Sequence, residues 1–268
     1  MTLGRALRWA AEHLDEKGVP DARLDAELLL GSALGLDRVE LYADGMRPLT
    51  DRELEAFQAL IDRRARREPA AYILGEWGFR RLTLRVDRRA LIPRPETEVV
   101  VERCLALLDG VSAPRVLDVG VGSGAIALAI ADEHPGARVV GVDTSGDALA
   151  LAGENAALTG IAIELRYGGF EVAEGDWDIV VSNPPYVSPA ELPSLQPEIR
   201  DWEPHEALVG EGLHERIARH VRSGWLVLEV GDGQAHRVAA ALEGIGYVDV
   251  QISRDLTERE RIVEGRRA

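Results

Sequence analysis

The stretch RVLDVGVGSGAIALAIA, residues 115–131, decides the fold. An apolar run with strand character leads into three alternate glycines, and an alanine-rich segment with helical character follows them. Glycine lets the backbone turn sharply and approach a ligand closely. A strand, a glycine-rich turn and a helix in this order predict a nucleotide-type site at the edge of a parallel sheet.

The ligand of this turn is ambiguous from the glycines alone. Gly120, Gly122 and Ala125 also fit the dinucleotide spacing G-x-G-x-x-A, which would place a pyrophosphate on the helix N-terminus. Asp118, just before the first glycine, would repel a pyrophosphate but suits the cationic amino acid end of S-adenosylmethionine. Asp143 ends the next predicted strand and can take both ribose hydroxyls of an adenosine. Since NAD has the same ribose, only Asp118 distinguishes an S-adenosylmethionine site from an NAD site.

Strand and helix patterns alternate on both sides of this stretch. Together with 115–119, the predicted strands are 138–142, 162–166, 178–182 and 225–230. The alternation predicts an α/β fold, a Rossmann-like and mainly parallel sheet that is covered on both faces. After a predicted helix at 233–244, the segments YVDVQIS and ERIVEGR have no helix between them, which predicts an antiparallel edge at the C-terminal end of the sheet.

The N-terminal part has a helical pattern instead. Apolar residues recur at helical spacing at Leu3, Leu7, Ala10 and Leu14. Further along, TDRELEAFQALIDRRARR opens with Thr50 followed by Glu53, which is the capping-box pattern of a helix start. These segments predict a small helical bundle with short loops.

A short β-segment separates the two patterns. Leu82, Leu84 and Val86 alternate with polar residues, so residues 78–94 are predicted to form a hairpin or strand pair, followed by a helix that begins near Glu96. We therefore divide the chain into a helical domain (1–76), a β-hairpin linker (77–95) and an α/β domain (96–268).

Charge limits the classes of partner. The 268 residues carry a formal net charge of −15, whereas broad nonspecific binding to DNA needs many Lys and Arg contacts to phosphates. Residues 63–94 form a basic island with ten Arg and three acids. We expect Arg63, Arg64, Arg66 and Arg67 to help dock an acidic or RNA-associated partner surface; the alternative is solvated side chains with local ion pairs.

Cysteine usage and hydropathy indicate a cytoplasmic protein. The single cysteine, Cys104, permits neither an internal disulfide nor a cysteine-based metal cage. It lies in a predicted helix, and we expect it to be a small core residue. No stretch approaches the roughly 20 apolar residues of a membrane span, and the acidic N-terminal segment does not resemble a signal peptide. We expect a monomer without a metal.

The sequence Asn183-Pro184-Pro185-Tyr186 follows the fourth predicted strand, at the edge where ligands of α/β sheets bind. An amide or exocyclic amine nitrogen is a poor nucleophile because its lone pair is delocalised. The Asn183 side-chain oxygen and the Pro184 carbonyl can accept its two N–H hydrogens, which directs the lone pair at a methyl carbon. Tyr186 can pack on the flat acceptor group. This chemistry requires orientation and charge placement rather than a metal or a strong base.

With these residues in place, the sequence resembles the class I S-adenosylmethionine methyltransferases, and more closely the HemK/PrmC family of release factor glutamine methyltransferases. The resemblance covers nearly the whole chain and rests on EPAAYILGEWGF, LIPRPETE, LDVGVGSGAIALAI, VVGVDTS, SNPPYV, WEPHEAL and LVLEVGDGQ. The segment RPETE is its specific part, because methyltransferases at large do not share it. The resemblance implies S-adenosylmethionine as the cofactor and methylation of the Gly-Gly-Gln glutamine of peptide chain release factors on its side-chain nitrogen. It also implies that residues 1–76 are a substrate-docking domain, which docks the release factor, and that residues 96–268 are the methyltransferase domain.

The resemblance also implies roles for individual residues. The implied catalytic residues are Asn183, Pro184 and Tyr186. The implied substrate-binding residues are Asn183, Pro184, Pro185, Tyr186, Glu96 and Thr97. The implied cofactor-binding residues are Asp118, Gly120, Val121, Gly122, Ser123, Gly124, Asp143, Gly169, Phe170 and Asn183. Glu203 is expected to brace the Asn-Pro-Pro-Tyr loop.

The predicted adenine side departs from the family pattern. Family members often show an acid and a large apolar residue before the position of Phe170, where this chain has Gly168 and Gly169. Phe170 can supply an apolar face to adenine or be a core residue. We therefore expect cofactor affinity to depend more on the other loops.

Two alternatives stay open. A nucleic-acid amino-methyltransferase acting on adenine would use the same Asn-Pro-Pro-Tyr chemistry, because an exocyclic amine presents the same two hydrogens. It would have to extrude a base and grip phosphates, and the charge of −15 counts against this. A non-catalytic NAD-binding or scaffold module is also compatible with the glycine loop alone.

Overall fold

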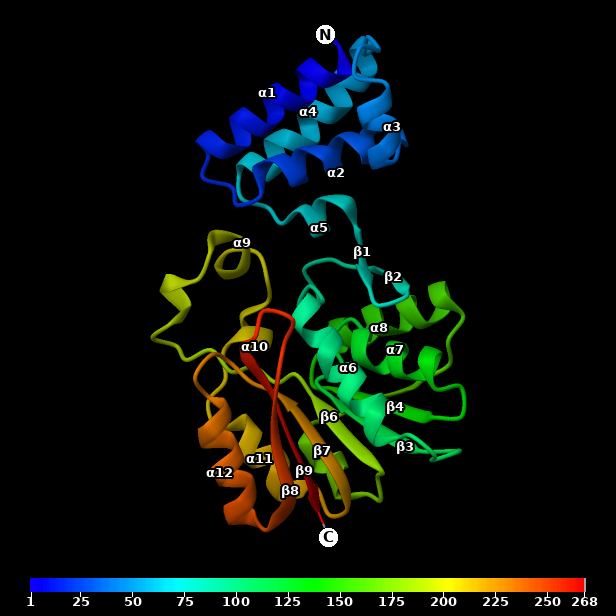
Figure 1. Cartoon of the computed structure of the whole chain (residues 1–268), viewed down its shortest axis with the longest axis vertical. Coiled ribbons are helices and arrows are strands. Elements are labelled where there is room, and N and C mark those ends of the chain that lie inside the picture. The colour runs from blue at the N-terminus through cyan, green and yellow to red at the C-terminus, as the bar shows by residue number, and fades with distance from the viewer. Residues whose placement is uncertain (268) are drawn as a thin grey trace. The chain divides into compact units, whose positions relative to one another are not determined.

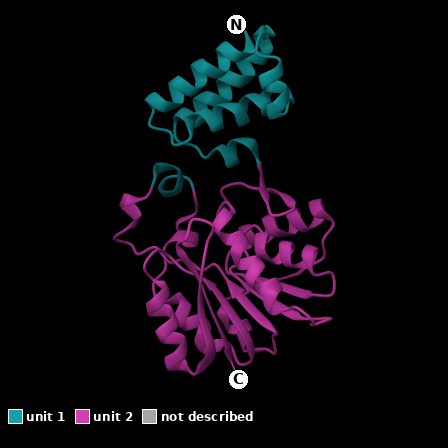
Figure 2. Cartoon of the chain, in the orientation of Figure 1, with its two compact units in different colours: residues 1–75, 196–202 teal, residues 76–195, 203–268 magenta. Residues whose placement is uncertain are grey.

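The structure, a computed structural model, describes residues 1–267. The chain forms two compact units (Figure 2). The first contains Met1–Gly75 together with Gln196–Trp202, and the second contains Glu76–Leu195 and the chain from Glu203 onward. The chain thus leaves the second unit after Leu195 and returns to it at Glu203. The predicted boundaries at residues 76 and 95 divide the chain by function, and they stay a prediction.

The first unit is helical, as predicted. Its helices are α1 (Leu3–Glu16), α2 (Ala22–Leu34), α3 (Arg38–Ala43), α4 (Asp51–Ala65), α5 (Ala70–Leu74) and α9 (Pro197–Arg200). The four apolar residues at helical spacing in α1 are all buried. At α4 the capping box is present, with the Thr50 hydroxyl and the Glu53 carboxylate each accepting the other residue's backbone N–H. Helices α3, α5 and α9 were not predicted, because segments this short show no helical period.

Of the four arginines predicted to dock a partner, Arg63 and Arg64 lie in α4, and Arg66 and Arg67 follow it. The docking role is wrong for Arg64, which is buried within this unit, and it stays a prediction for the other three. Arg64 is 3% exposed; its Nε donates to Asp25 at 2.6 Å and its Nη2 to Glu198 at 2.8 Å. Arg67 donates twice to Glu198, at 2.7 and 2.6 Å. Arg63 is paired with Glu68 at the end of the same helix. These local ion pairs anchor the segment that contains α9.

The second unit is built on a seven-stranded sheet (Figure 1). Its strands are β3 (Arg115–Val119), β4 (Arg138–Asp143), β5 (Glu164–Tyr167), β6 (Ile179–Ser182), β7 (Gly224–Glu229), β8 (Tyr247–Arg254) and β9 (Glu260–Arg267). The order across the sheet is β5-β4-β3-β6-β7-β9-β8. The first five strands in this order are parallel, and β9 pairs antiparallel with both β7 and β8. The predicted mainly parallel sheet with an antiparallel C-terminal edge is confirmed.

Helices cover both faces of this sheet, as predicted. On one face, α6 (Pro95–Leu107), α7 (Ala125–Glu133) and α8 (Gly146–Thr159) share a core with alternate strand residues such as Val116 and Val181. On the other face, α11 (Leu213–His220) and α12 (Ala235–Ile245) pack against the intervening residues, such as Leu117 and Val180. This alternation follows from the period of two along a strand. Cys104 is fully buried in the first core.

The β-segment before the sheet is shorter than predicted. Strands β1 (Glu76–Phe79) and β2 (Leu82–Arg85) form an antiparallel pair, but residues 86–94 are not strand. There the Asp87 carboxylate accepts from the backbone and side chain of Arg89, which closes a local turn, and Pro93 cannot donate to a ladder. Strand β5 likewise begins at Glu164 instead of 162. The remaining short elements are η1 (Phe170–Glu174), η2 (Leu192–Ser194) and α10 (His205–Leu208).

Across residues 1–267, the helices are all too short or too polar to cross a membrane.

Candidate active site

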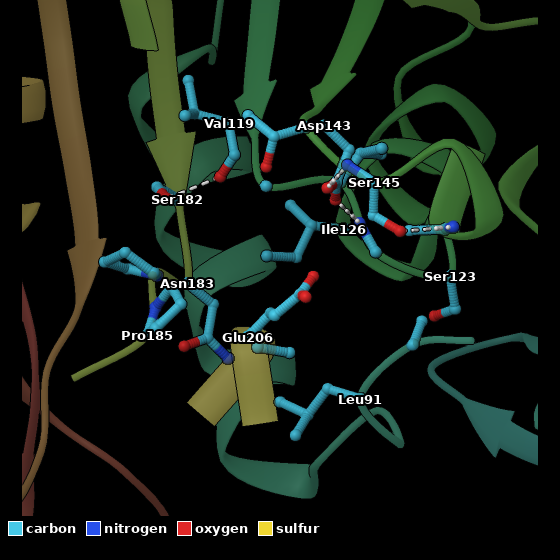
Figure 3. Close-up of a pocket in the computed structure, with 18 of the residues that line it drawn as sticks. Leu91, Val119, Ser123, Ile126, Asp143, Ser145, Ser182, Asn183, Pro185 and Glu206 are labelled. Atoms are coloured by element: carbon cyan, nitrogen blue, oxygen red, sulfur yellow. Dashed lines mark hydrogen bonds between the residues drawn. The ribbon is translucent and has the colours of Figure 1, made fainter. Parts of the chain in front are cut away.

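The glycine loop and the Asn-Pro-Pro-Tyr loop meet where the strand order of the sheet reverses. Strand β3 pairs with β4 on one side and with β6 on the other, and the two loops follow the carboxyl ends of β3 and β6. Ligands of open α/β sheets bind at this switch point. A cavity of about 590 Å³ lies here, entirely within the second unit. Figure 3 shows Asp143 and Asn183 among the residues around it.

The glycine loop is held tightly against β4. The backbone N–H groups of Gly120 and Val121 both donate to the Val142 carbonyl at 2.9 Å. Gly124 has φ +88° and begins the transition to α7; a Cβ there would lie 3.1 Å from the Leu128 side chain, so the position requires glycine.

Asp143 is a preoriented acceptor at the end of β4. One carboxylate oxygen accepts the Gly122 N–H and the other accepts the Ser145 N–H, each at 2.9 Å. Both bonds fix the plane of the carboxylate, and each oxygen keeps a second lone pair. With the apolar walls of the cavity, this carboxylate fits the paired hydroxyls of a ribose.

Asp118 lies behind the glycine loop. Its side chain is fully buried, and its Oδ2 accepts the Ala127 N–H at 3.1 Å. Its Oδ1 is buried and has no hydrogen-bond partner among residues 1–267. Burial raises the pKa of Asp118 to about 7, and the neighbouring Asp143 adds to this. An unsatisfied buried oxygen needs a donor, so the residue fits a cationic or N–H-bearing ligand group better than a phosphate.

The Asn-Pro-Pro-Tyr loop is fixed to its surroundings by side chains on three elements. Ser182, the last residue of β6, donates to the Val119 carbonyl at 2.6 Å, which ties the two loops together (Figure 3). The Asn183 amide Nδ2 donates to the Thr97 hydroxyl of α6 at 3.3 Å. The Tyr186 hydroxyl donates to Glu229, at the end of β7, at 3.4 Å, and burial raises the pKa of this phenol.

Most of the predicted site residues line one cavity. Those that do are Gly120, Val121, Gly122, Ser123, Asp143, Gly169, Phe170, Asn183, Pro184, Pro185 and Thr97. The other four, Asp118, Gly124, Tyr186 and Glu96, lie outside its lining. Gly124 shapes the loop and Tyr186 anchors its far end, whereas Glu96 precedes Thr97 in the first turn of α6. The roles assigned to all of these residues stay predictions.

Phe170 belongs partly to the cavity and partly to the core. It lines the cavity and also packs against the α11–α12 core. The Arg216 guanidinium lies 4.7 Å from the Phe170 ring centre, and the His220 ring lies 4.8 Å away at a tilt. These contacts hold the Phe170 ring in place beside Gly168 and Gly169, the two positions at which this chain departs from the family pattern.

Several cavity residues were not predicted. They come from the loop before α6 (Arg89, Leu91 and Ile92) and from the segment around α10 (Pro204, Glu206 and Ala207). Figure 3 shows Leu91 and Glu206 among the residues that line the same cavity as Asn183. The available signal was that these residues lie in or next to LIPRPETE and WEPHEAL, two of the segments on which the family resemblance rests; local periodicity gave none.

Glu203 holds a different loop from the one predicted. It is buried, and its carboxylate accepts from the Ile92 N–H at 3.4 Å and pairs with the Arg94 guanidinium. It therefore braces the loop before α6 and not the Asn-Pro-Pro-Tyr loop. Burial raises the pKa of Glu203, and Arg94 opposes this.

Glu229 is the most informative residue that was missed. It ends β7, is 2% exposed, and accepts the Thr97 hydroxyl at 2.7 Å. Burial raises its pKa to about 7, against the lowering effect of the Thr97 bond. An acid inside the apolar run WLVLEV, at the carboxyl end of a parallel strand, was the available signal.

Family comparisons agree with this geometry. Residues 5–75 match the PrmC N-terminal domain, and residues 99–196 match the methyltransferase small domain. A release factor glutamine methyltransferase of Geobacter sulfurreducens is 44% identical over 99% of this chain and 96% of that protein. The chain belongs to the release factor glutamine methyltransferase family.

Other comparisons support this family membership and the fold. The release factor glutamine methyltransferase of Chlorobaculum tepidum is 42% identical over 92% of this chain and 90% of that protein. Among solved structures, the T. thermophilus 16S rRNA N2 G1207 methyltransferase in complex with AdoMet and guanosine has a TM-score of 0.52. It is 18% identical and covers 72% of this chain and 50% of that chain, so this likeness shows the fold alone.

Proposed function

We propose that this family member transfers a methyl group from S-adenosylmethionine to the side-chain amide nitrogen of the Gly-Gly-Gln glutamine of peptide chain release factors. The observation that carries the proposal is the cavity at the β3–β6 switch point, where a glycine loop and an oriented Asn183 amide face the same space. Relatives across the full length of the chain bear the name release factor glutamine methyltransferase.

The chain's residues act by orientation. Bound S-adenosylmethionine supplies an electrophilic methyl group on a positively charged sulfur. The Asn183 Oδ1 and the Pro184 carbonyl accept the two hydrogens of the substrate amide, so that the nitrogen lone pair faces that methyl group. Proline fixes the direction of its carbonyl. The proton leaves after transfer, when the nitrogen is far more acidic, so the site needs no strong base.

Cofactor binding is assigned to the loops after β3, β4 and β5. Asp143 takes the ribose hydroxyls with a carboxylate that two backbone N–H groups already orient. The glycine loop, from Gly120 to Gly124, supports the amino acid portion, with Asp118 behind it as a buried acceptor. Phe170 offers an apolar face to the adenine.

The partner assignment follows from the family and from charge. We assign docking of the release factor to residues 1–76, and we propose a monomer that works in the cytoplasm on protein and not on nucleic acid. Ion pairs occupy most of the basic island that would favour nucleic acid, since Arg80, Arg85, Arg89 and Arg94 all pair with acids of the second unit. Little of its charge is left for phosphates.

A transfer assay with labelled cofactor tests the substrate. Release factors that carry Gly-Gly-Gln and Gly-Gly-Ala are compared at equal concentration. We expect label only on the Gly-Gly-Gln protein, and equal labelling of both would overturn the proposal. Strong transfer to naked DNA or RNA would favour the nucleic-acid alternative, and tight NAD binding without S-adenosylmethionine binding would favour the non-catalytic one.

A further inference from the structure

Three side chains from distant parts of the second unit form one hydrogen-bonded chain beside the cavity. The Glu229 carboxylate accepts the Thr97 hydroxyl at 2.7 Å, and the same hydroxyl oxygen lies 3.3 Å from the Asn183 Nδ2. Strands β6 and β7 are parallel neighbours with Ser182 opposite Leu228, so Asn183 and Glu229 both follow directly from paired positions. Thr97, in the first turn of α6, bridges them.

The number of hydrogens available to these three side chains fixes the orientation of the Asn183 amide. The Thr97 hydroxyl has a single hydrogen, and ionised Glu229 can only accept, so in the ionised form of Glu229 the contact at 2.7 Å directs that hydrogen to its carboxylate. Its oxygen is then only an acceptor for Asn183, so the NH2 end of the amide must face Thr97. Because the amide is planar, its carbonyl oxygen faces away from Thr97, and Asn183 itself lines the cavity. The end of Asn183 that accepts a substrate hydrogen is thereby selected.

Glu229 is placed for this task and not for an ion pair. Its carboxylate is 2% exposed and accepts from two hydroxyl groups, those of Thr97 and Tyr186. The neighbouring guanidinium, Arg261, directs its own bonds to Asp232, Asp255 and the Val230 carbonyl. The Glu229 backbone is held as well, since its carbonyl is 2.9 Å from the His214 ring. A buried acid without a direct cation costs stability, which indicates a functional reason for its presence.

We propose that Glu229 is a positioning residue for methyl transfer, which acts through the Thr97 hydroxyl to fix which end of the Asn183 amide faces the substrate nitrogen. The inference rests on the proposed function, because it concerns the same acceptor nitrogen. With the amide reversed, Asn183 would present its NH2 group to the N–H of the substrate, and transfer would slow while the cofactor loops stay intact.

Substitutions at Thr97 give a matched pair. Thr97→Val keeps the shape and removes the hydroxyl, whereas Thr97→Ser keeps the hydroxyl. We expect kcat on a Gly-Gly-Gln release factor to fall about 100-fold for Thr97→Val, the loss typical of one misplaced electrostatic contact in a transition state. Thr97→Ser should stay within about fivefold of the wild type. The Kd for S-adenosylmethionine and the Tm of both variants show whether each protein is folded and loaded.

Reversing the donor and acceptor roles in the hydrogen bonds that link Asn183, Thr97 and Glu229 gives a sharper test. When Asn183→Asp is assayed well above the pKa of Glu229, one hydroxyl hydrogen must serve two carboxylates, so we expect a loss of about 100-fold. Adding Glu229→Gln supplies an NH2 donor to Thr97, whose hydrogen can then go to the new carboxylate and leave its other oxygen for the substrate. The double variant should therefore be at least about tenfold more active than Asn183→Asp alone. Glu229→Gln alone keeps an acceptor oxygen and should lose less than about tenfold.

The outcomes distinguish the positioning role of Glu229 from the proposed methylation of Gly-Gly-Gln. The positioning role of Glu229 is supported if the double variant is more active than Asn183→Asp, if Thr97→Ser stays active and if Thr97→Val loses activity. A double variant that is no better than Asn183→Asp, or a Thr97→Val enzyme with normal kcat, overturns it while the function stands. A wild-type protein that binds S-adenosylmethionine but fails to methylate Gly-Gly-Gln overturns the proposed function, and the positioning role is withdrawn with it.

Discussion

Replacing Arg64 by alanine removes the cation at the centre of a buried charge cluster in the helical unit. Its guanidinium bonds Asp25 at 2.6 Å and Glu198 at 2.8 Å, and the side chain is almost inaccessible. Glu198 would keep its two bonds from Arg67, but Asp25 would lose the arginine that opposes its burial. Burial already raises the pKa of Asp25, against the lowering effect of Arg64.

Removing one partner of a buried pair destabilises a protein by about 3–5 kcal/mol, because it leaves an uncompensated charge. Since Glu198 stays paired, we expect a loss near 3 kcal/mol. The titration of Asp25 determines how the stability loss of Arg64→Ala changes with pH. Without Arg64, the folded-state pKa of Asp25 lies still further above its unfolded value. Protonated Asp25 therefore contributes to the free energy of unfolding. This contribution is full below the pKa of Asp25 in the unfolded protein, and it is lost as pH rises through the pKa of Asp25 in the folded protein. The penalty of Arg64→Ala should therefore shrink as pH falls from 7 to 5.

Hydrogen exchange measured by mass spectrometry localises this effect. A loss of 3 kcal/mol corresponds to roughly 100-fold faster exchange of amides that open with the helical unit, namely those of α4 and residues 196–202. The matched control is Arg66→Ala, an exposed neighbour on the same helix end, which should change stability by less than about 0.5 kcal/mol. The reasoning is refuted if Arg64→Ala exchanges no faster than Arg66→Ala in these segments.

Three further predictions concern the catalytic unit. A Cβ in Gly231→Ala would meet the Tyr186 ring at 3.0 Å, so displacement of the ring should lower kcat about tenfold without changing the Kd for S-adenosylmethionine, as titration calorimetry and steady-state kinetics would show. In Gly141→Ala the new Cβ would lie 2.6 Å from a methyl carbon of Val121, so we expect a loss of about 1–3 kcal/mol and weaker cofactor binding, measured by denaturation and titration. Because burial raises the pKa of Asp118 to about 7, the wild type should lose stability relative to Asp118→Asn as pH rises from 5 to 8, and a pH-independent difference between their denaturation curves would contradict this.

The sheet and the meeting of its two loops could be predicted because both depend on local patterns. Val116 and Leu117 are both buried, in the cores on opposite faces of the sheet, as the period of a strand requires. Parallel strands also bring their carboxyl ends to one edge, so the glycine loop and Asn183 had to lie near each other once both were assigned to strand ends.

The contacts that fix the site could not be predicted in the same way. Thr97 and Glu229 are 132 positions apart, and Arg64 and Glu198 are 134 apart. No periodicity connects such pairs, and a count of charges cannot show which arginines are buried against acids. This is why the four arginines at and just after the end of α4 were interpreted as a docking surface, although Arg64 and Arg67 bond Glu198 of α9 in the helical unit.

The most direct test of the central claim is to locate the transferred methyl group by fragmentation mass spectrometry of a release factor treated with the enzyme and S-adenosylmethionine. The account predicts one methyl group on the side-chain nitrogen of the Gly-Gly-Gln glutamine, and none after treatment with the Asn183→Ala variant. A methyl group on another residue, or undiminished transfer by Asn183→Ala, would contradict it.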